Sequence, residues 1–165
     1  VEGEIARTTE AFFTNEVAPH VEAIQHQEPG LAQSILRKSA ELGLTAVMIP
    51  EAYGGMEMDL VSALIVAEQI SRDGSYAGWH GAHTGIGTLP LVLFGNEEQK
   101  KKYLPRLATA ELIAAYCLSE PQAGSDAMNI KTRKNTEPLH LPAANRDQRN
   151  TRCRNRTFAF SRRND

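Results

Sequence analysis

The sequence predicts a mainly α-helical protein, in which a helical bundle passes into the first strand of a second unit. Apolar residues recur at helical spacing through much of the first 110 residues. A capping pattern at Asn96 opens a further helix, and a short apolar run then ends at Pro121. The chain of 165 residues, with 41% hydrophobic and 23% charged residues, has the size and composition of one globular domain.

The first element is an amphipathic helix over residues 4–17. Its apolar residues lie among polar ones at helical spacing. They are Ile5, Phe12, Phe13 and Val17. Pro19 lacks a backbone N–H and predicts a break or a fresh helical start.

The second element is a helix over residues 31–42. Leu31, Ile35, Leu36 and Leu42 are expected on roughly one face. Gly43 is a good terminator, because glycine enters the left-handed conformation at little cost.

An extended segment and a nearly all-apolar helix are predicted next. Residues 44–55 are apolar and end at a Gly pair, which favours an extended segment that leads to a turn. Asp59 is a candidate N-cap for a helix over residues 60–70. That helix is apolar on nearly every side, which predicts a central place in the bundle.

Two more helices precede the strand. Residues 75–95 predict a helix weakened by several glycines, with a break near Pro90. Asn96, followed by Gln99 three residues later, resembles a capping box, and Pro105 predicts an early end for the helix that it opens.

Composition excludes several classes of protein. No apolar run approaches the roughly 20 residues that a membrane span needs, and no signal peptide is predicted. Cys117 and Cys153 form neither a CxxC pair nor a disulfide framework, which favours a reducing compartment.

Charge divides the chain near Ile130. Residues 1–130 hold 8 Lys and Arg against 17 Asp and Glu, a net charge of −9. Residues 131–165 hold 10 against 3, a net charge of +7. Low hydrophobicity with high charge predicts a disordered tail without strands, and it leaves open binding of a polyanion such as nucleic acid.

The tract after Ala115, YCLSEPQAGSDAM over residues 116–128, is the most distinctive stretch. The apolar run before it predicts a buried strand. Hydroxyls, carboxylates, a proline and a glycine then follow within a few positions, which is also ordinary turn chemistry.

Three stretches together resemble the acyl-CoA dehydrogenase family. They are GLTAVMIPEAYGG (43–55), FGNEEQKKKYLPRLA (94–108) and YCLSEPQAGSDA (116–127), and their order and spacing match the family as well. The resemblance covers roughly residues 4–133. The residues around AHTGIG and KKKYLP are most similar to the long- and very-long-chain acyl-CoA branch of the family.

The resemblance implies a domain organisation. It implies an N-terminal helical bundle over residues 1–111 and the start of a truncated β-domain over residues 112–133. Residues 134–165 then form a divergent basic tail. The family's C-terminal helical domain, which carries its catalytic Glu, has no counterpart here, so the sequence predicts no catalytic residue, and Glu120 is not assigned as the base.

The resemblance also implies a flavin site and a reaction. Family members transfer a hydride from an acyl-CoA thioester to N5 of FAD and pass electrons to an electron-transfer flavoprotein, generally as tetramers. Ser119 stands where the family usually has Thr, and Ser125 matches the Ser that also meets the acyl-CoA. The residues implied to face the flavin are Tyr116, Cys117, Leu118, Ser119, Gly124 and Ser125.

Partners and location follow from the same resemblance. It implies acyl-CoA and an electron-transfer flavoprotein as partners, with no specific nucleic acid, and a bacterial cytoplasm or a mitochondrial matrix as location. A non-catalytic helical fragment that joins full-length relatives stays open as an alternative, beside polyanion binding through the tail.

The family pattern stops abruptly near Lys134, which motivates the hypothesis of a truncated chain whose tail is out of frame. Translating the adjacent reading frames tests it, because one of them should restore an Asn-Gly hairpin and a Trp-Ile motif. Such a chain is expected to have little activity alone and to leave the edge of its strand unpaired.

The other motifs give little evidence of a functional site. His80 and His83 have a spacing that can bind metal from one helix, but no further ligand lies nearby, so packed or surface histidines and no metal are predicted. Gly85 and Gly87 do not complete a dinucleotide fingerprint. Ser125 has no obvious His partner, which disfavours nucleophilic catalysis.

Overall fold

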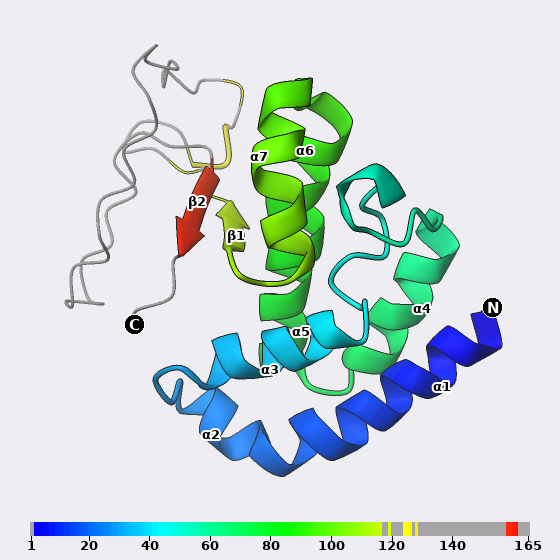
Figure 1. Ribbon diagram of the computed structural model, residues 1–165. Helices are drawn as coiled ribbons and strands as arrows, with labels where there is room; N and C mark the ends of the chain where they lie inside the picture. Colours follow the sequence, from blue (N-terminus) through cyan, green and yellow to red (C-terminus); the bar gives the residue numbers. More distant parts are fainter. Residues whose placement is uncertain (1, 117–118, 120–123, 127, 129–157, 162–165) are drawn as a thin grey trace.

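The structure is a computed structural model that describes residues 2–116, 119, 124–126, 128 and 158–161. It is a helical bundle with a short strand pair at one side (Figure 1). The elements in chain order are α1 (Glu2–Phe12), η1 (Phe13–Val17), η2 (Ala18–His20), α2 (Val21–Gln25), α3 (Leu31–Glu41), η3 (Glu51–Tyr53), α4 (Leu60–Ile70), α5 (Gly74–Gly81), η4 (Ala82–Thr88), α6 (Leu89–Phe94), α7 (Glu97–Ala108), β1 (Ile113–Tyr116) and β2 (Phe158–Ser161).

The predicted N-terminal helix is confirmed. It is α1 continued by one π-helical stretch, η1, and its four predicted apolar residues are all buried. Pro19 occupies the first turn of the 3-10 helix η2, where a missing N–H costs least, and α2 follows at once. The chain therefore turns at Pro19 without leaving helical geometry.

Helix α3 is also confirmed, with one correction. Ile35 and Leu36 are buried as predicted, but Leu42 follows the last helical residue and is 46% exposed. Gly43 has a φ of +77°, the left-handed value expected of a terminator. A Cβ at that position would lie 2.7 Å from Sδ of Met56, so the Met56 side chain would have to shift to make room for it.

Residues 44–55 form successive turns and the short helix η3, so the extended segment predicted for them is wrong. The segment folds onto itself: the N–H of Met56 donates to Ala46 O at 3.0 Å, and that of Met58 donates to Val47 O at 2.8 Å. Because Ala46 and Val47 are buried, their carbonyls need partners, and these turns supply them.

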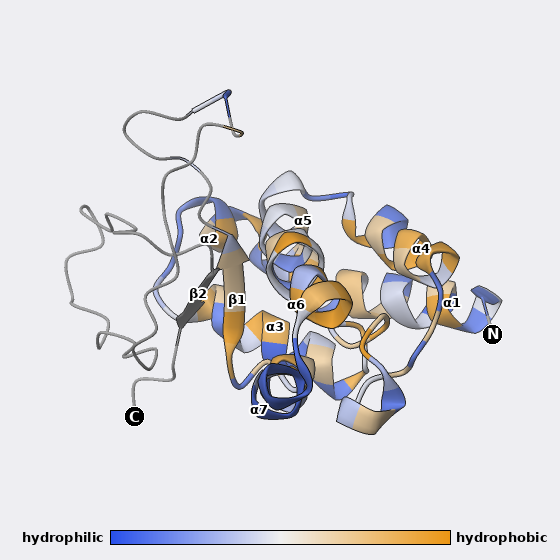
Figure 2. Ribbon diagram, turned by 90° about the horizontal axis from the view of Figure 1, so that it is seen from above, coloured by the Kyte–Doolittle hydropathy of each residue, from blue (hydrophilic) through white to orange (hydrophobic). Residues whose placement is uncertain are grey.

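Helix α4 begins as predicted but lies elsewhere. Oδ1 of Asp59 accepts the Ser62 N–H at 2.9 Å, so Asp59 is the N-cap. The predicted central position is wrong, because Leu60, Val61 and Leu64 are 50–60% exposed. Only one face packs inward, and Figure 2 shows α4 as largely hydrophobic ribbon near the outside of the bundle.

Residues 74–94 run helically through α5, η4 and α6 (Figure 1), so the break predicted near Pro90 is wrong. Asp73 caps α5 by accepting the Tyr76 N–H at 2.8 Å. Pro90 stands in the first turn of α6, directly after the π-helical η4.

Helix α7 confirms the capping box and corrects its end. Asn96 Oδ1 accepts the Gln99 N–H at 2.8 Å, and Gln99 Oε1 accepts the Asn96 N–H at 3.0 Å. The helix passes through Pro105 and ends at Ala108. Leu107 and Ala108 are buried, and this packing holds the last turn in place despite Pro105.

Two apolar clusters form the core. One joins α1, η1, α2, α3, α4 and α5, with Val17, Ile24 and Tyr76 fully buried. The other joins residues 46–49, α7 and β1. The second cluster packs the start of β1 against the helices.

Candidate functional site

The strand that leads into the distinctive tract is present. β1 pairs antiparallel with β2, with Ala114 opposite Phe160 and Tyr116 opposite Phe158. The tail was expected to hold no strand, and the edge of β1 was expected to be unpaired; both expectations are wrong for the four residues of β2. Figure 1 shows β1 between β2 and the helices α6 and α7.

The π-helical η4 meets β1 at very close range. A Cβ on Gly87 would lie 2.6 Å from Cβ of Ala114 and 2.9 Å from its carbonyl carbon. It would also lie 2.6 Å from Ala82 O. Only glycine allows the strand to approach the helix this closely.

His83 joins three parts of the chain through its ring. Its Nδ1 accepts the Ala114 N–H at 3.1 Å, and its Nε2 lies 3.1 Å from Leu107 O. A backbone N–H only donates and a carbonyl only accepts, so the ring is neutral with its proton on Nε2. His83 is fully buried, and burial lowers the pKa of its imidazole, although the Leu107 carbonyl opposes that shift.

Hydroxyl groups satisfy the carbonyls of this helix. Thr88 Oγ1 donates to His83 O at 2.7 Å, and Thr84 Oγ1 donates to His80 O at 2.9 Å. Each hydroxyl bonds to a carbonyl four or five residues earlier in the same helix, a pattern typical of Ser and Thr within helices.

Hydrogen bonds at the end of α7 hold the short segment that leads from this helix to β1. Buried Thr45 donates to Ala108 O at 2.7 Å, and the Leu112 N–H donates to Arg106 O at 3.0 Å. On the outside, Nη2 of Arg106 lies 2.7 Å from a carboxylate oxygen of Glu111.

The predicted flavin residues divide into three groups. Tyr116 is half-buried at the end of β1, whereas Ser119, Gly124 and Ser125 are exposed. Cys117 and Leu118 lie outside the described residues, as does Glu120. Tyr116, the first residue of the tract, therefore lies beside the helical domain at the end of β1, and the described serines lie on the surface.

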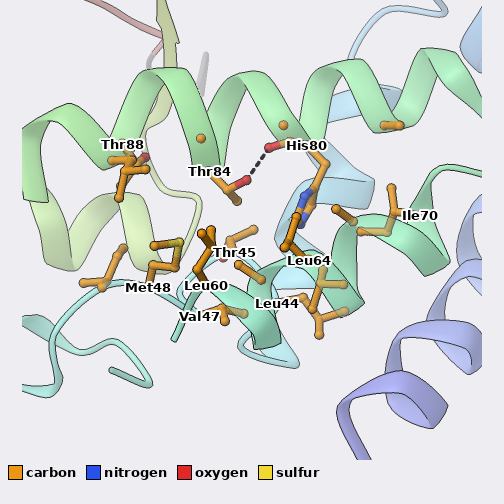
Figure 3. Close-up of a pocket in the computed structure, with 18 of the residues that line it drawn as sticks. Leu44, Thr45, Val47, Met48, Leu60, Leu64, Ile70, His80, Thr84 and Thr88 are labelled. Atoms are coloured by element: carbon orange, nitrogen blue, oxygen red, sulfur yellow. Dashed lines mark hydrogen bonds between the residues drawn. The ribbon is translucent and has the colours of Figure 1, made fainter. Parts of the chain in front are cut away.

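A pocket that the sequence did not indicate lies on another side of the same helix. It has a volume of about 260 Å³, and Figure 3 shows His80, Thr84 and Thr88 along one wall, facing Leu60 and Leu64. The remaining lining comes mainly from apolar side chains of residues 44–49 and α4. The pattern that could have predicted it is the spacing of Gly81, Thr84, Gly85 and Thr88, which puts small residues on one face of this helix.

His80 is buried at this pocket, and its Nε2 has no hydrogen-bond partner within the described residues. Burial lowers the pKa of His80 to about 4, and the nearby His83 contributes in the same direction. The ring is therefore neutral near pH 7. Of the two alternatives that the sequence left open, packed or surface histidines, both positions are packed.

Two kinds of feature are absent from the part of the chain that the structure describes. No group of three His, Cys, Asp or Glu side chains could hold a metal ion there. No helix there is both long and apolar enough to cross a membrane.

Comparison with known proteins decides the family. Residues 2–111 match the family described as "Acyl-CoA dehydrogenase, N-terminal domain". The chain belongs to the acyl-CoA dehydrogenase family. The predicted helical bundle and the three-motif resemblance are thereby confirmed.

Similar proteins agree with this assignment. A "Probable acyl-CoA dehydrogenase" of Bacillus subtilis (strain 168) is 49% identical over 128 residues, which are 78% of this chain and 22% of that protein. The acyl-CoA dehydrogenase of Bacillus anthracis, solved in complex with FAD, is 53% identical with a TM-score of 0.77 and covers 79% of this chain.

A more distant structure shows the same fold. Butyryl-CoA dehydrogenase from Megasphaera elsdenii is 26% identical with a TM-score of 0.68, over 79% of this chain and 35% of that one. Because the chain spans only 22% of the first two of these proteins, it corresponds to an N-terminal part of such a dehydrogenase.

Proposed function

We propose that this chain is the N-terminal part of an FAD-dependent acyl-CoA dehydrogenase, and that the tract after β1 contributes one edge of the flavin site. The observation that carries the proposal is the match over residues 2–111 together with the strand that continues directly into that tract. The complex of the Bacillus anthracis relative with FAD supports the choice of cofactor.

The described residues fit such a group. The hydroxyls of Ser119 and Ser125 are exposed and can donate to flavin oxygens and nitrogens. Among the described residues, no atom lies within 4 Å of the place that a Cβ on Gly124 would take, so these residues leave room for a flat ring to approach the backbone there. Tyr116, at the end of β1, would border the ring. Cys117 and Leu118, between Tyr116 and Ser119 in the sequence, would also face it.

The chemistry would be α,β-dehydrogenation of an acyl-CoA thioester. FAD, when bound, supplies the acceptor for the hydride that leaves the β-carbon. Residues of this chain would orient the cofactor and, through Ser125, the substrate. We assign the base that removes the α-proton to the C-terminal part of the family's enzymes, so this chain alone should not turn over acyl-CoA.

Partners and location are part of the same proposal. An electron-transfer flavoprotein would take the electrons, and the intact enzyme would form a tetramer in a bacterial cytoplasm or a mitochondrial matrix. Polyanion binding stays a prediction, because the basic residues of the tail lie outside the described residues. The same is true of the out-of-frame origin of residues 134–165.

Titration of the purified chain with FAD tests the proposal. We expect flavin to bind, with a visible absorption band, and Ser119→Ala and Ser125→Ala each to weaken binding by about three- to tenfold, the effect of one lost hydrogen bond. Ser71→Ala is the control, because that exposed hydroxyl donates to Glu68 O at 2.7 Å and lies at the end of α4. A chain that takes up no flavin, or equal losses in all three variants, would contradict the proposed role of the tract.

A further inference from the structure

We propose that His83 is a positioning residue: it fixes where β1 lies against the helices and thereby where the flavin-facing tract begins. The flavin part of this inference rests on the proposed function. The part that concerns β1 rests only on the contacts of the imidazole ring.

Both nitrogens of His83 hold backbone groups from distant parts of the chain. Nδ1 accepts the Ala114 N–H, 31 positions away, and Nε2 donates to Leu107 O, 24 positions away, each at 3.1 Å. The ring is fully buried, so water cannot replace either partner. One side chain thus ties the end of α7 and the start of β1 to η4.

The hydrogen bond to Ala114 lies close enough to the tract to affect its position. Tyr116 follows Ala114 by two residues, a distance of about 7 Å along a strand. Apolar packing alone lets a short strand slide along its axis, whereas a directional hydrogen bond to its backbone sets its register. Gly87, one helical turn after His83, removes the side chain that would keep β1 farther away. Together the two residues set both the depth and the register of the strand.

The two bonds can be separated by substitution. The side-chain oxygen of Asn stands in for Nδ1 of a histidine, and the side-chain nitrogen of Gln stands in for Nε2. His83→Asn therefore keeps the acceptor for Ala114 and loses the donor to Leu107. His83→Gln keeps the donor and loses the acceptor.

Thr45→Val is a matched control. Thr45 is buried and donates to Ala108 O, one residue from Leu107, without a hydrogen bond to β1. The variant removes a buried hydrogen bond of the same kind from the same helix end. It reports what loss of stability alone does to β1.

Amide hydrogen exchange of the full chain, followed residue by residue by NMR, is the first test. We expect His83→Asn to keep the protection of Ala114 within about threefold of the original chain, and His83→Gln to lower it by about tenfold, the effect of one hydrogen bond. In Thr45→Val the amides of β1 and of the core should change by the same factor. Equal protection of Ala114 in the Asn and Gln variants, or a loss in Gln no larger than in Thr45→Val, would overturn the proposal.

FAD affinity, measured on the same proteins by flavin fluorescence, is the second test. We expect affinity to follow the protection of β1, so that His83→Gln binds FAD about tenfold more weakly than His83→Asn even where their thermal stabilities agree. An affinity that follows thermal stability instead would overturn the positioning role. If the original chain binds no FAD, the proposed function fails, and amide exchange still decides whether His83 holds β1.

Discussion

The helical stretch over residues 74–94 packs closely against its neighbour on one side and borders a pocket on another. Toward β1, the backbone at Gly87 lies too close to Ala114 for any side chain, and both ring nitrogens of His83 are hydrogen-bonded. Toward α4, small residues and His80 border a pocket of about 260 Å³, and Nε2 of His80 has no partner within the described residues. The closely packed side contacts β1, the strand that leads to the proposed flavin tract. The side with the pocket contacts α4, a helix with one exposed face.

The contrast teaches that one helix can combine rigid and adaptable packing. Directional bonds to backbone groups fix one arrangement, whereas apolar contacts around a pocket tolerate several. Three predictions test whether the two sides differ as much as this suggests.

The largest expected effect is on the pH dependence of stability. His80 has a pKa of about 4 in the folded chain against an ordinary value of 6.5, and burial lowers the pKa of His83 as well. The unfolded chain therefore binds more protons between these values, so stability is full above pH 6.5 and falls as the pH drops toward 4. For His80 alone the loss is on the order of 3 kcal/mol.

Urea unfolding between pH 7 and pH 4.5 measures this dependence. His80→Leu should remove the contribution of His80 to this pH dependence and flatten the curve. Nε2 of His80 has no partner within the described residues, and the only hydrogen bond that bears on the pKa of its ring is one with the backbone of Leu44. His83→Leu should also flatten the curve, but it leaves the Ala114 N–H and the Leu107 carbonyl without their partner. It should therefore be the less stable variant at pH 7, by roughly 1–3 kcal/mol. Equal stability of the two variants would remove the distinction between the two sides.

The second prediction compares two glycines of η4. Gly87→Ala forces a methyl group against the backbone of Ala114 and should lower the free energy of unfolding by about 1–3 kcal/mol. Gly85→Ala has no atom within 4 Å of its new Cβ and borders the pocket. It should be neutral or stabilising by up to about 1 kcal/mol, because alanine favours a helix. Thermal unfolding of both variants measures the difference, and similar losses would show that η4 packs tightly on both sides.

Local signals in the sequence predicted local features well. Asp59 and Asn96 cap their helices and Gly43 ends one, because each acts through bonds within a few residues of itself. The strand at Ile113–Tyr116 was also predicted, from a short apolar run. The proposed flavin tract, in contrast, was predicted through family resemblance, since its turn chemistry alone is common.

Features that depend on distant partners were missed. Pro105 was expected to end its helix, but buried Leu107 and Ala108 carry the helix past it. Helix α4 was expected at the centre because it is so apolar, yet Leu60 and Leu64 are exposed while charged α7 buries Leu104 completely. Average hydropathy cannot reveal which neighbour a helix meets, and the partners of His83 lie 24 and 31 positions away.

The smallest expected effect concerns the pocket itself. Gly81 borders the pocket and Gly78 does not, and at neither glycine does any atom lie within 4 Å of the place that a Cβ would take. Alanine should raise helix stability at each position by about 0.5–1 kcal/mol. The two gains should be equal, because no atom lies close enough to either new methyl group to add a contact or to clash with it. Chemical denaturation of the two variants side by side measures this gain, and a loss of stability at Gly81 alone would mean that the side facing α4 is as tightly packed as the side facing β1.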